Sequence, residues 1–556
     1  MFVIYQIFTR TFSNKNISCI ENGSIETNGV GKMNDFTPKV LNKIKKGGFT
    51  HVWFTGVIRH ATTTDYSAFG IPKQHTQVVK GKAGSPYAIT DYYDIDPDIA
   101  EDITHRMEEF EALIERTHKQ ELKVIIDFVP NHVAREYKSV TAPECVNDLG
   151  ADDDVNKHFD PQNNFYYCPQ TVLDLSDIIS SANIEAYTEY PAKCTGNDHF
   201  DAKPSNNDWY ETVKLNYGID YCDLGGRSEH FTPIPSTWLK MTDILLFWAA
   251  KGIDGFRCDM AEMVPAAFWK YATAKVKEHF PNVIFIGEVY APNQYRNYLA
   301  AGFNYLYDKV GMYDCLRDVM CGYRPASDIT SAWQSVDDIH DHMLNFLENH
   351  DEQRIASDFF AGDAKKGIPA LMVAALFQSN PMMIYAGQEF GEKGMAKEGF
   401  SGIDGRSTIF DYWNTPTVMK AFYNIGRLSP QQRYIRDTYY KILRLCNEET
   451  AISEGLTYDL MYANFDKLTF DTSKLFAFMR KKDKDLLLIV ANFDKEAHEV
   501  SVTIPEHAIE FLRIRQNFYL MTDLLTGESI DAVISPNGEI KMSVSGYNGR
   551  IWKITM

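Results

Sequence analysis

Four acidic residues lie within or just after separate apolar runs of this 556-residue chain. Taken singly, each is explained by a salt bridge or a helix cap. Together they suggest chemistry, because clustered carboxylates repel one another and their pKa values move apart. One of them can then attack while another carries a proton, as glycoside cleavage requires. The four are Asp127 in KVIIDFVP, Asp259 in GIDGFRCDM, Glu288 in VIFIGEVY and Asp351 after NFLENH.

A positive charge accompanies one of these acids. Arg257 precedes Asp259 by two residues, so both side chains lie on the same face of a strand. One interpretation is a structural salt bridge at a strand end. The other is that the guanidinium keeps a reacting carboxylate ionised and oriented, which would justify the cost of burying both charges.

Apolar runs that alternate with helical patterns must position these residues. Such alternation predicts parallel βα units, and eight strands fit a closed (β/α)8 barrel. An open doubly wound sheet is the alternative, but no glycine-rich nucleotide fingerprint follows any strand. The helical pattern from Phe36 to Lys46 follows Asp35, which we expect to cap it. The eight strands begin near Val3, His51, Lys123, Gly252, Val283, Asn304, Asn345 and Met382.

Two regions interrupt the alternation and divide the chain into domains. Residues 133–235 are polar and irregular, and too long for a plain loop in a compact domain, so we interpret them as an inserted domain. From 449 to 556 the chain is rich in short strands and turns, which predicts a C-terminal antiparallel β-sandwich. Residues 1–132 and 236–448 then form the catalytic barrel.

Composition restricts the partners. The net charge of −19 argues against nucleic acid or an anionic membrane, because phosphate repels an acidic surface. No apolar run reaches the ~18 residues of a transmembrane helix. The N-terminus lacks the basic start and cleavage site of a signal peptide. The sequence leaves the compartment open: periplasmic or extracellular if a leader has been removed, and otherwise cytoplasmic.

The nine cysteines are scattered and include no CxxC pair, which gives no support for a zinc ribbon. The sequence also allows a disulfide within the inserted domain, between two of the residues Cys145, Cys168, Cys194 and Cys222.

Four short motifs resemble those of the α-amylase family of glycoside hydrolases, which includes neopullulanase-like enzymes. They occur in the family's order, each on the expected strand, and four in order are a specific signal. VKLN at Val213 in the inserted domain and SPYAITDYYDIDP at Ser85 resemble further family stretches. The four motifs are DFVPNH from Asp127, GFRCD from Gly255, IGEV from Ile286 and ENHD from Glu348.

The resemblance implies roles for these positions. Asp259 would be the nucleophile and Glu288 the general acid and then base. Asp351 would stabilise the transition state, and Arg257 would keep Asp259 ionised. Among the remaining substrate-site matches, His132 and His350 would hydrogen-bond the sugar, and Tyr87 would stack under the ring. Asp127 would orient the site rather than act on the substrate.

The resemblance also implies calcium, because Asn131 matches a position that ligates this ion in many members. An asparagine that holds backbone groups is the alternative. Further ligands would come from the inserted domain, for example among Asp152, Asp153 and Asp154. A loop at residues 28–35 partly resembles a second metal loop but has Lys32 where an acid is expected. Glu262 and Met263 replace the family's Lys-His pair, which leaves the substrate subsites open.

These features predict a retaining hydrolase of α-1,4-glucosidic bonds in starch-derived glucans or maltooligosaccharides, with no organic cofactor. The two catalytic carboxyls should lie roughly 5 Å apart. A transglycosylase of the same fold, such as a glucanotransferase, is the alternative. A catalytically silent sugar-binding relative is a third interpretation, which the complete set of acids disfavours.

Overall fold

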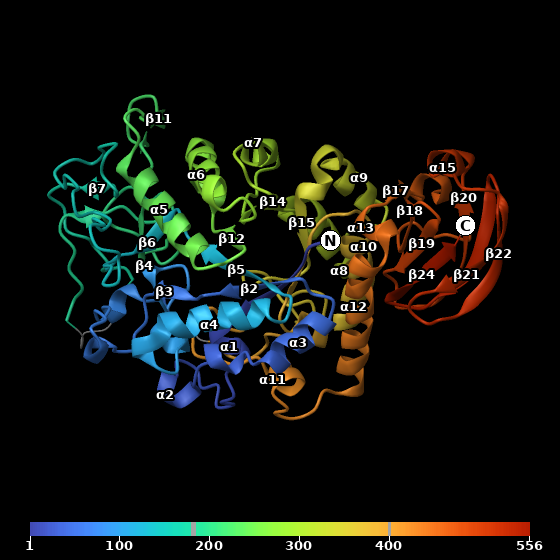
Figure 1. Cartoon of the computed structure of the whole chain (residues 1–556), viewed down its shortest axis with the longest axis horizontal. Coiled ribbons are helices and arrows are strands. Elements are labelled where there is room, and N and C mark those ends of the chain that lie inside the picture. The colour runs from blue at the N-terminus through green and yellow to red at the C-terminus, as the bar shows by residue number, and fades with distance from the viewer. Residues whose placement is uncertain (179–184, 399–401, 556) are drawn as a thin grey trace.

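A closed barrel of eight parallel strands forms the centre of the protein (Figure 1). The computed structural model describes residues 1–178, 185–398 and 402–555. Every predicted barrel strand is found, which confirms the (β/α)8 fold and excludes the open sheet. In barrel order the strands are β1 (Val3–Phe8), β16 (Met382–Tyr385), β15 (Met343–Phe346), β14 (Tyr305–Tyr307), β13 (Ile284–Gly287), β12 (Gly255–Cys258), β5 (Lys123–Phe128) and β2 (His51–Thr55).

Helices connect the strands and cover the barrel from outside (Figure 1). The side chain of Thr37 caps the first long helix by accepting the N–H of Val40, so the prediction that Asp35 caps it was wrong. Threonine stands directly before Pro38, and proline suits the first helical position. The main helices are α3 (Pro38–Lys46), α4 (Arg106–His118), α5 (Ser236–Ala250), α6 (Ala266–His279), α7 (Tyr295–Ala300), α8 (Asp314–Cys321), α9 (Asp328–Gln334), α10 (Gly367–Leu376), α11 (Pro416–Phe422) and α12 (Pro430–Glu448).

The inserted segment between β5 and α5 folds as irregular chain with short paired strands, and lies away from the C-terminal domain (Figure 1). One pair joins it to the barrel, since β6 directly follows β5. All nine cysteines lie among the described residues and are free thiols, with Cys168 Sγ 3.9 Å from Cys194 Sγ. The strand pairs are β6 (His132–Ala134) with β9 (Thr212–Lys214), β7 (Tyr167–Cys168) with β8 (Ala192–Lys193), and β10 (Ile219–Asp220) with β11 (Ser228–Glu229).

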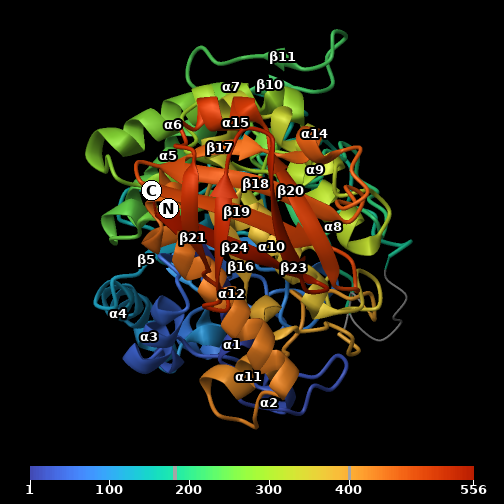
Figure 2. The same ribbon diagram turned by 90° about the vertical axis from the view of Figure 1, so that its right-hand side faces the viewer.

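The C-terminal region is antiparallel throughout, as predicted (Figure 2). A two-stranded sheet of β20 (His498–Ile504) and β23 (Gly538–Val544) accompanies a six-stranded sheet. The strands of the larger sheet are, in order, β17 (Leu456–Asp459), β18 (Leu475–Lys482), β19 (Asp485–Asn492), β24 (Asn548–Thr555), β21 (Asn517–Asp523) and β22 (Ser529–Ile534).

Helix α10 joins the barrel and the C-terminal sheet into one core. All ten of its residues are buried. Gly549 of β24 lies so close to Met372 of α10 that a Cβ there would collide with the methionine. Arg480 of β18 donates to the Leu376 carbonyl at the end of α10, 3.2 Å away, and to the carbonyls of Ala451, Ile452 and Gly455. The buried guanidinium thus donates hydrogen bonds to backbone carbonyls of both the barrel and the C-terminal region.

Among residues 1–178, 185–398 and 402–555, no helix combines the length and apolar character needed to cross a bilayer.

Candidate active site

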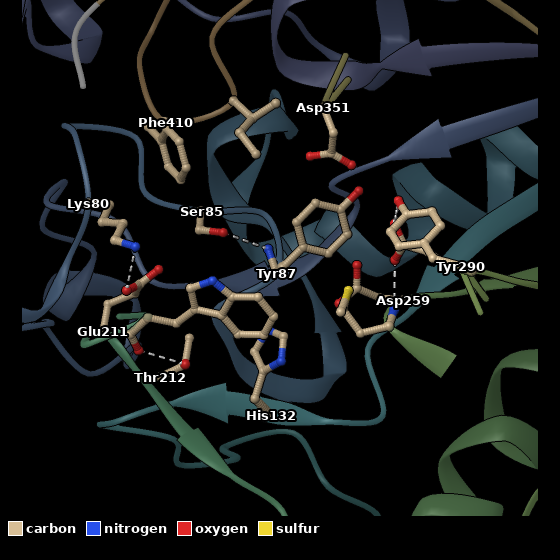
Figure 3. A pocket seen from close by; sticks show the side chains of 14 residues that line it. Lys80, Ser85, Tyr87, His132, Glu211, Thr212, Asp259, Tyr290, Asp351 and Phe410 are labelled. Carbon is tan, nitrogen blue, oxygen red and sulfur yellow. Dashed lines mark hydrogen bonds and ion pairs between the residues drawn. The ribbon is translucent and has the colours of Figure 1, made fainter. Parts of the chain in front are cut away.

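Two of the predicted acids directly follow adjacent barrel strands. Asp259 comes after β12 and Glu288 after β13. Their backbone N–H groups continue the ladder, with Asp259 N donating to Phe128 O at 2.9 Å and Glu288 N to Cys258 O at 3.1 Å. Asp351 follows β15 at a greater distance along the chain. All three carboxyls line one cavity of about 260 Å³ (Figure 3).

Arg257 contacts the carboxyl groups of both Asp259 and Glu288. Its Nη1 lies 2.7 Å from Asp259 Oδ1 and its Nη2 lies 2.8 Å from Glu288 Oε2. On the adjacent strand Asp127 is its register partner, with Oδ1 3.4 Å from Nη1. The guanidinium is fully buried, and the Tyr307 hydroxyl lies 3.2 Å from its Nε. A buried cation shared by several carboxylates stabilises their charged forms.

The pKa of the Asp259 carboxyl reflects this balance. Burial raises it well above the ordinary value, Arg257 lowers it, and the neighbouring charges of Glu288 and Asp127 raise it. Burial also raises the pKa of Asp127 to about 6, although Arg257 and a hydrogen bond from Trp53 Nε1 oppose the rise. Arg257 is therefore the main group that favours an ionised Asp259.

Glu288 is held at both oxygens. Its Oε2 accepts the backbone N–H of Met260 at 2.7 Å, and its Oε1 accepts the Tyr290 hydroxyl at 2.5 Å. Met260 has φ of +43°, a left-handed conformation that costs a residue with a side chain ~1–3 kcal/mol. That conformation places the N–H next to the carboxylate that follows the neighbouring strand.

Asp351 points into the cavity, and 43% of its side chain remains exposed there (Figure 3). The surrounding walls desolvate the carboxyl and raise its pKa, and the charge of Glu288 raises it further. His350 Nε2 lies 3.1 Å from Asp351 Oδ2 and 2.5 Å from the Tyr87 hydroxyl. The structure therefore brings these predicted residues together at the cavity.

Both predicted histidines are neutral groups near pH 7. Burial lowers the pKa of His132 to about 3 and that of His350 well below its ordinary value. On its other side, His350 Nδ1 lies 2.8 Å from Gln6 Nε2 of β1. Neutral imidazoles can donate and accept hydrogen bonds, which suits them to uncharged hydroxyl groups.

With this geometry in view, comparison with known proteins decides the family. The family model for the alpha amylase catalytic domain matches residues 6–422. The chain belongs to the alpha-amylase family of glycoside hydrolases.

Individual relatives of the alpha-amylase family are distant. Alpha-amylase 3 of Dictyoglomus thermophilum is 22% identical over 513 residues, covering 89% of this chain and 85% of that protein. A cyclomaltodextrin glucanotransferase of Geobacillus stearothermophilus is 23% identical over 413 residues, covering 70% of this chain and 49% of that protein. A maltogenic alpha-amylase structure from Thermotoga neapolitana has a TM-score of 0.64 at 19% identity, covering 100% of this chain and 99% of the other. The last similarity shows the shared fold.

Several residues of this alpha-amylase-family cavity were missed from the sequence. Tyr290 was detectable, because it stands two residues after Glu288. Trp209 comes from the irregular inserted segment and packs on His132, with ring centroids 5.1 Å apart. At the other end of the cavity Lys80 pairs with Glu211 at 3.1 Å (Figure 3). No periodic pattern marks these loop residues.

Arg257, Asp127 and His350 are not among the residues that line this cavity. Asn131 does not line it either. It lies behind the wall, where its Nδ2 donates to Gly196 O at 2.8 Å and lies 3.2 Å from His132 Nδ1. Its Oδ1 accepts a hydrogen bond from the ammonium group of Lys214.

Proposed function

We propose that this protein is a retaining hydrolase of α-1,4-glucosidic bonds in starch-derived glucans or maltooligosaccharides. The observation that supports it most is the shared guanidinium, because Arg257 contacts both Asp259 and Glu288 at the wall of a cavity that also holds Asp351. The relatives named as amylases support the substrate class.

In the first step the Asp259 carboxylate attacks the anomeric carbon. The glycosidic C–O bond breaks, and protonated Glu288 gives its proton to the departing oxygen, leaving a covalent glycosyl-enzyme. Arg257 favours the ionised nucleophile. Asp351, His132 and His350 hold the sugar hydroxyls, and Tyr87 provides a ring face beside them.

In the second step a water molecule attacks the same carbon from the vacated side. Glu288, now ionised, takes the water's proton while the bond to Asp259 breaks. Two inversions retain the α-anomer. The separation of roughly 5 Å between the carboxyls stays a prediction.

Paired variants test the two roles. Glu288→Gln should lower kcat on maltooligosaccharides by about 10²–10⁴-fold, because it cannot protonate the leaving oxygen. It should lose much less in the glycosylation step with α-glucosyl fluoride, whose leaving group needs little protonation. Asp259→Asn should lose activity on both substrates, because no nucleophile remains. Equal losses with both substrates in Glu288→Gln would contradict the acid role.

A transglycosylase is the second candidate, because a relative at 23% identity is named a glucanotransferase. The same three carboxyls serve either outcome, which differs only in whether water or a sugar hydroxyl resolves the intermediate. Incubation with maltoheptaose separates the two. Shorter products alone indicate hydrolysis, and products longer than the substrate indicate transfer.

A further inference from the structure

Lys214 places a positive charge where three oxygens meet behind the active site. Its side chain is 2% exposed. The ammonium donates to Asn131 Oδ1, lies 2.7 Å from Asp198 Oδ1 and donates to Met263 O at 3.3 Å. An amide oxygen, a carboxylate and a backbone carbonyl are oxygen ligands of the kinds that calcium prefers. Here the ammonium group of Lys214 already contacts all three oxygens.

These residues do not fit a calcium ion beside Asn131. A divalent cation within reach of Asn131 Oδ1 and Asp198 would also lie against the buried ammonium, and like charges repel strongly there. Of the three aspartates suggested as further ligands, Asp152, Asp153 and Asp154, Asp153 is also engaged, because it accepts the backbone N–H groups of Asn164 and Phe165. Within the described residues no group of three or more acidic, histidine or cysteine side chains could hold a metal.

The second loop with a metal-like pattern repeats this arrangement. Lys32 stands where an acid was expected, and its ammonium donates to the carbonyls of Asp98 at 2.7 Å and Ala100 at 2.9 Å. A lysine thus supplies the positive charge at both places where the sequence suggested a metal.

We propose that Lys214 is the resident cation of the junction between the barrel and the inserted domain, and that it replaces calcium there. It also positions the active site. Lys214 lies opposite His132 in the β6–β9 ladder, and the amide it holds belongs to Asn131, the neighbour of that histidine. Through Met263 O it fixes the turn that follows Asp259.

The first test measures thermal unfolding of the wild-type protein, which does not depend on the proposed function. Excess EDTA or millimolar calcium should leave Tm unchanged, because Lys214 already supplies the positive charge at this junction. A fall in Tm with EDTA that calcium reverses would overturn the proposal.

The second test addresses positioning and rests on the proposed function. Lys214→Met should lower Tm by about 5 °C or more, because Asn131 Oδ1 and Asp198 lose their cation. Well below that Tm, kcat/KM on maltooligosaccharides should fall ten- to hundredfold, since small displacements of binding groups are costly (~10²-fold per Å). An unchanged kcat/KM would overturn the positioning role.

Lys193→Met is the matched control. Lys193 is another lysine of the inserted domain, whose ammonium donates to Arg135 O at 3.0 Å and lies 3.9 Å from Glu189. It touches neither Asn131 nor the turn after Asp259, so this variant should lower Tm while keeping kcat/KM. Loss of activity in both variants would mean that Lys214 has no specific positioning role. If wild type itself cleaves no α-glucan, the proposed function fails while the EDTA result still stands.

Discussion

The guanidinium of Arg257 lies 2.8 Å from the carboxylate of Glu288. The sequence suggests a pair between Arg257 and Asp259, which lie two residues apart. In the barrel, Nη2 of Arg257 also lies beside Glu288, the residue that follows the next strand, β13. A single buried cation therefore acts on both carboxyls of the proposed mechanism. Because its positive charge lowers the pKa of Asp259, its removal should change the pH range in which the enzyme works.

Arg257→Met should move the acid limb of the kcat/KM profile to higher pH, by roughly one unit or more. Arg257 lowers the pKa of Asp259, so its loss lets burial and the other carboxylates raise that pKa further. The nucleophile is then protonated up to a higher pH. Arg257→Lys, which keeps the charge, should shift the limb less. Identical limbs in wild type and Arg257→Met would contradict this electrostatic role.

Tyr290→Phe should lower kcat about tenfold or more, because the Tyr290 hydroxyl holds Glu288 Oε1 at 2.5 Å. Steady-state kinetics on maltooligosaccharides measures the effect. Tyr305→Phe is the control, since the Tyr305 ring packs against Phe2 and does not line the cavity. Equal activity of both variants would show that Glu288 needs no hydroxyl partner.

Glu389→Gln should gain stability relative to wild type as pH rises from about 5 to 8. Burial raises the pKa of Glu389 from its ordinary 4.5 to about 7, against hydrogen bonds from Tyr5 and Gly387. A raised carboxyl pKa stabilises the fold below pH ~4.5, and this contribution is lost as pH rises through ~7. The loss is about 3 kcal/mol for the wild type, and the neutral glutamine avoids it.

Thermal unfolding across this pH range measures that difference. The gap in Tm between Glu389→Gln and wild type should change in favour of the variant at higher pH. Glu108→Gln, at an exposed position of α4, is the control variant. A constant gap for Glu389→Gln would contradict the raised pKa.

Arg480→Met should destabilise the protein by about 3–5 kcal/mol, because several buried carbonyl oxygens lose their donor. Denaturant unfolding measures the change. Arg324→Met is the control, because Arg324 is half exposed and pairs with Asp318 at the surface, where ion pairs contribute ~0–1 kcal/mol. Equal destabilisation by both variants would show that the carbonyl contacts of Arg480 are unimportant.

The sequence predicted the barrel well because its strands are continuous apolar runs, and the acids stand at their ends. Asp259 and Glu288 follow β12 and β13 directly, so the parallel ladder alone brings them together. The helix cap was misplaced by two residues, since both Asp35 and Thr37 are capping types, and the signal that favours Thr37 is the proline that follows it.

The part of the cavity that comes from the inserted segment could not be predicted, because tertiary contacts place it. Trp209 and Glu211 come from irregular chain with no period to follow. Lys214 was visible only as one letter of a motif. Its interaction with Asn131 depends on strand β9 crossing back to β6, more than eighty residues from the amide that it holds.

The burial of α10 also determines when this enzyme can finish folding. Its helix is synthesised well before β24, the final strand, whose Gly549 covers Met372. A nascent chain that has completed all eight barrel strands still exposes that apolar helix. During synthesis, α10 can therefore gain its final packing only once β24 has formed, although every residue proposed for catalysis precedes that strand by almost two hundred residues or more.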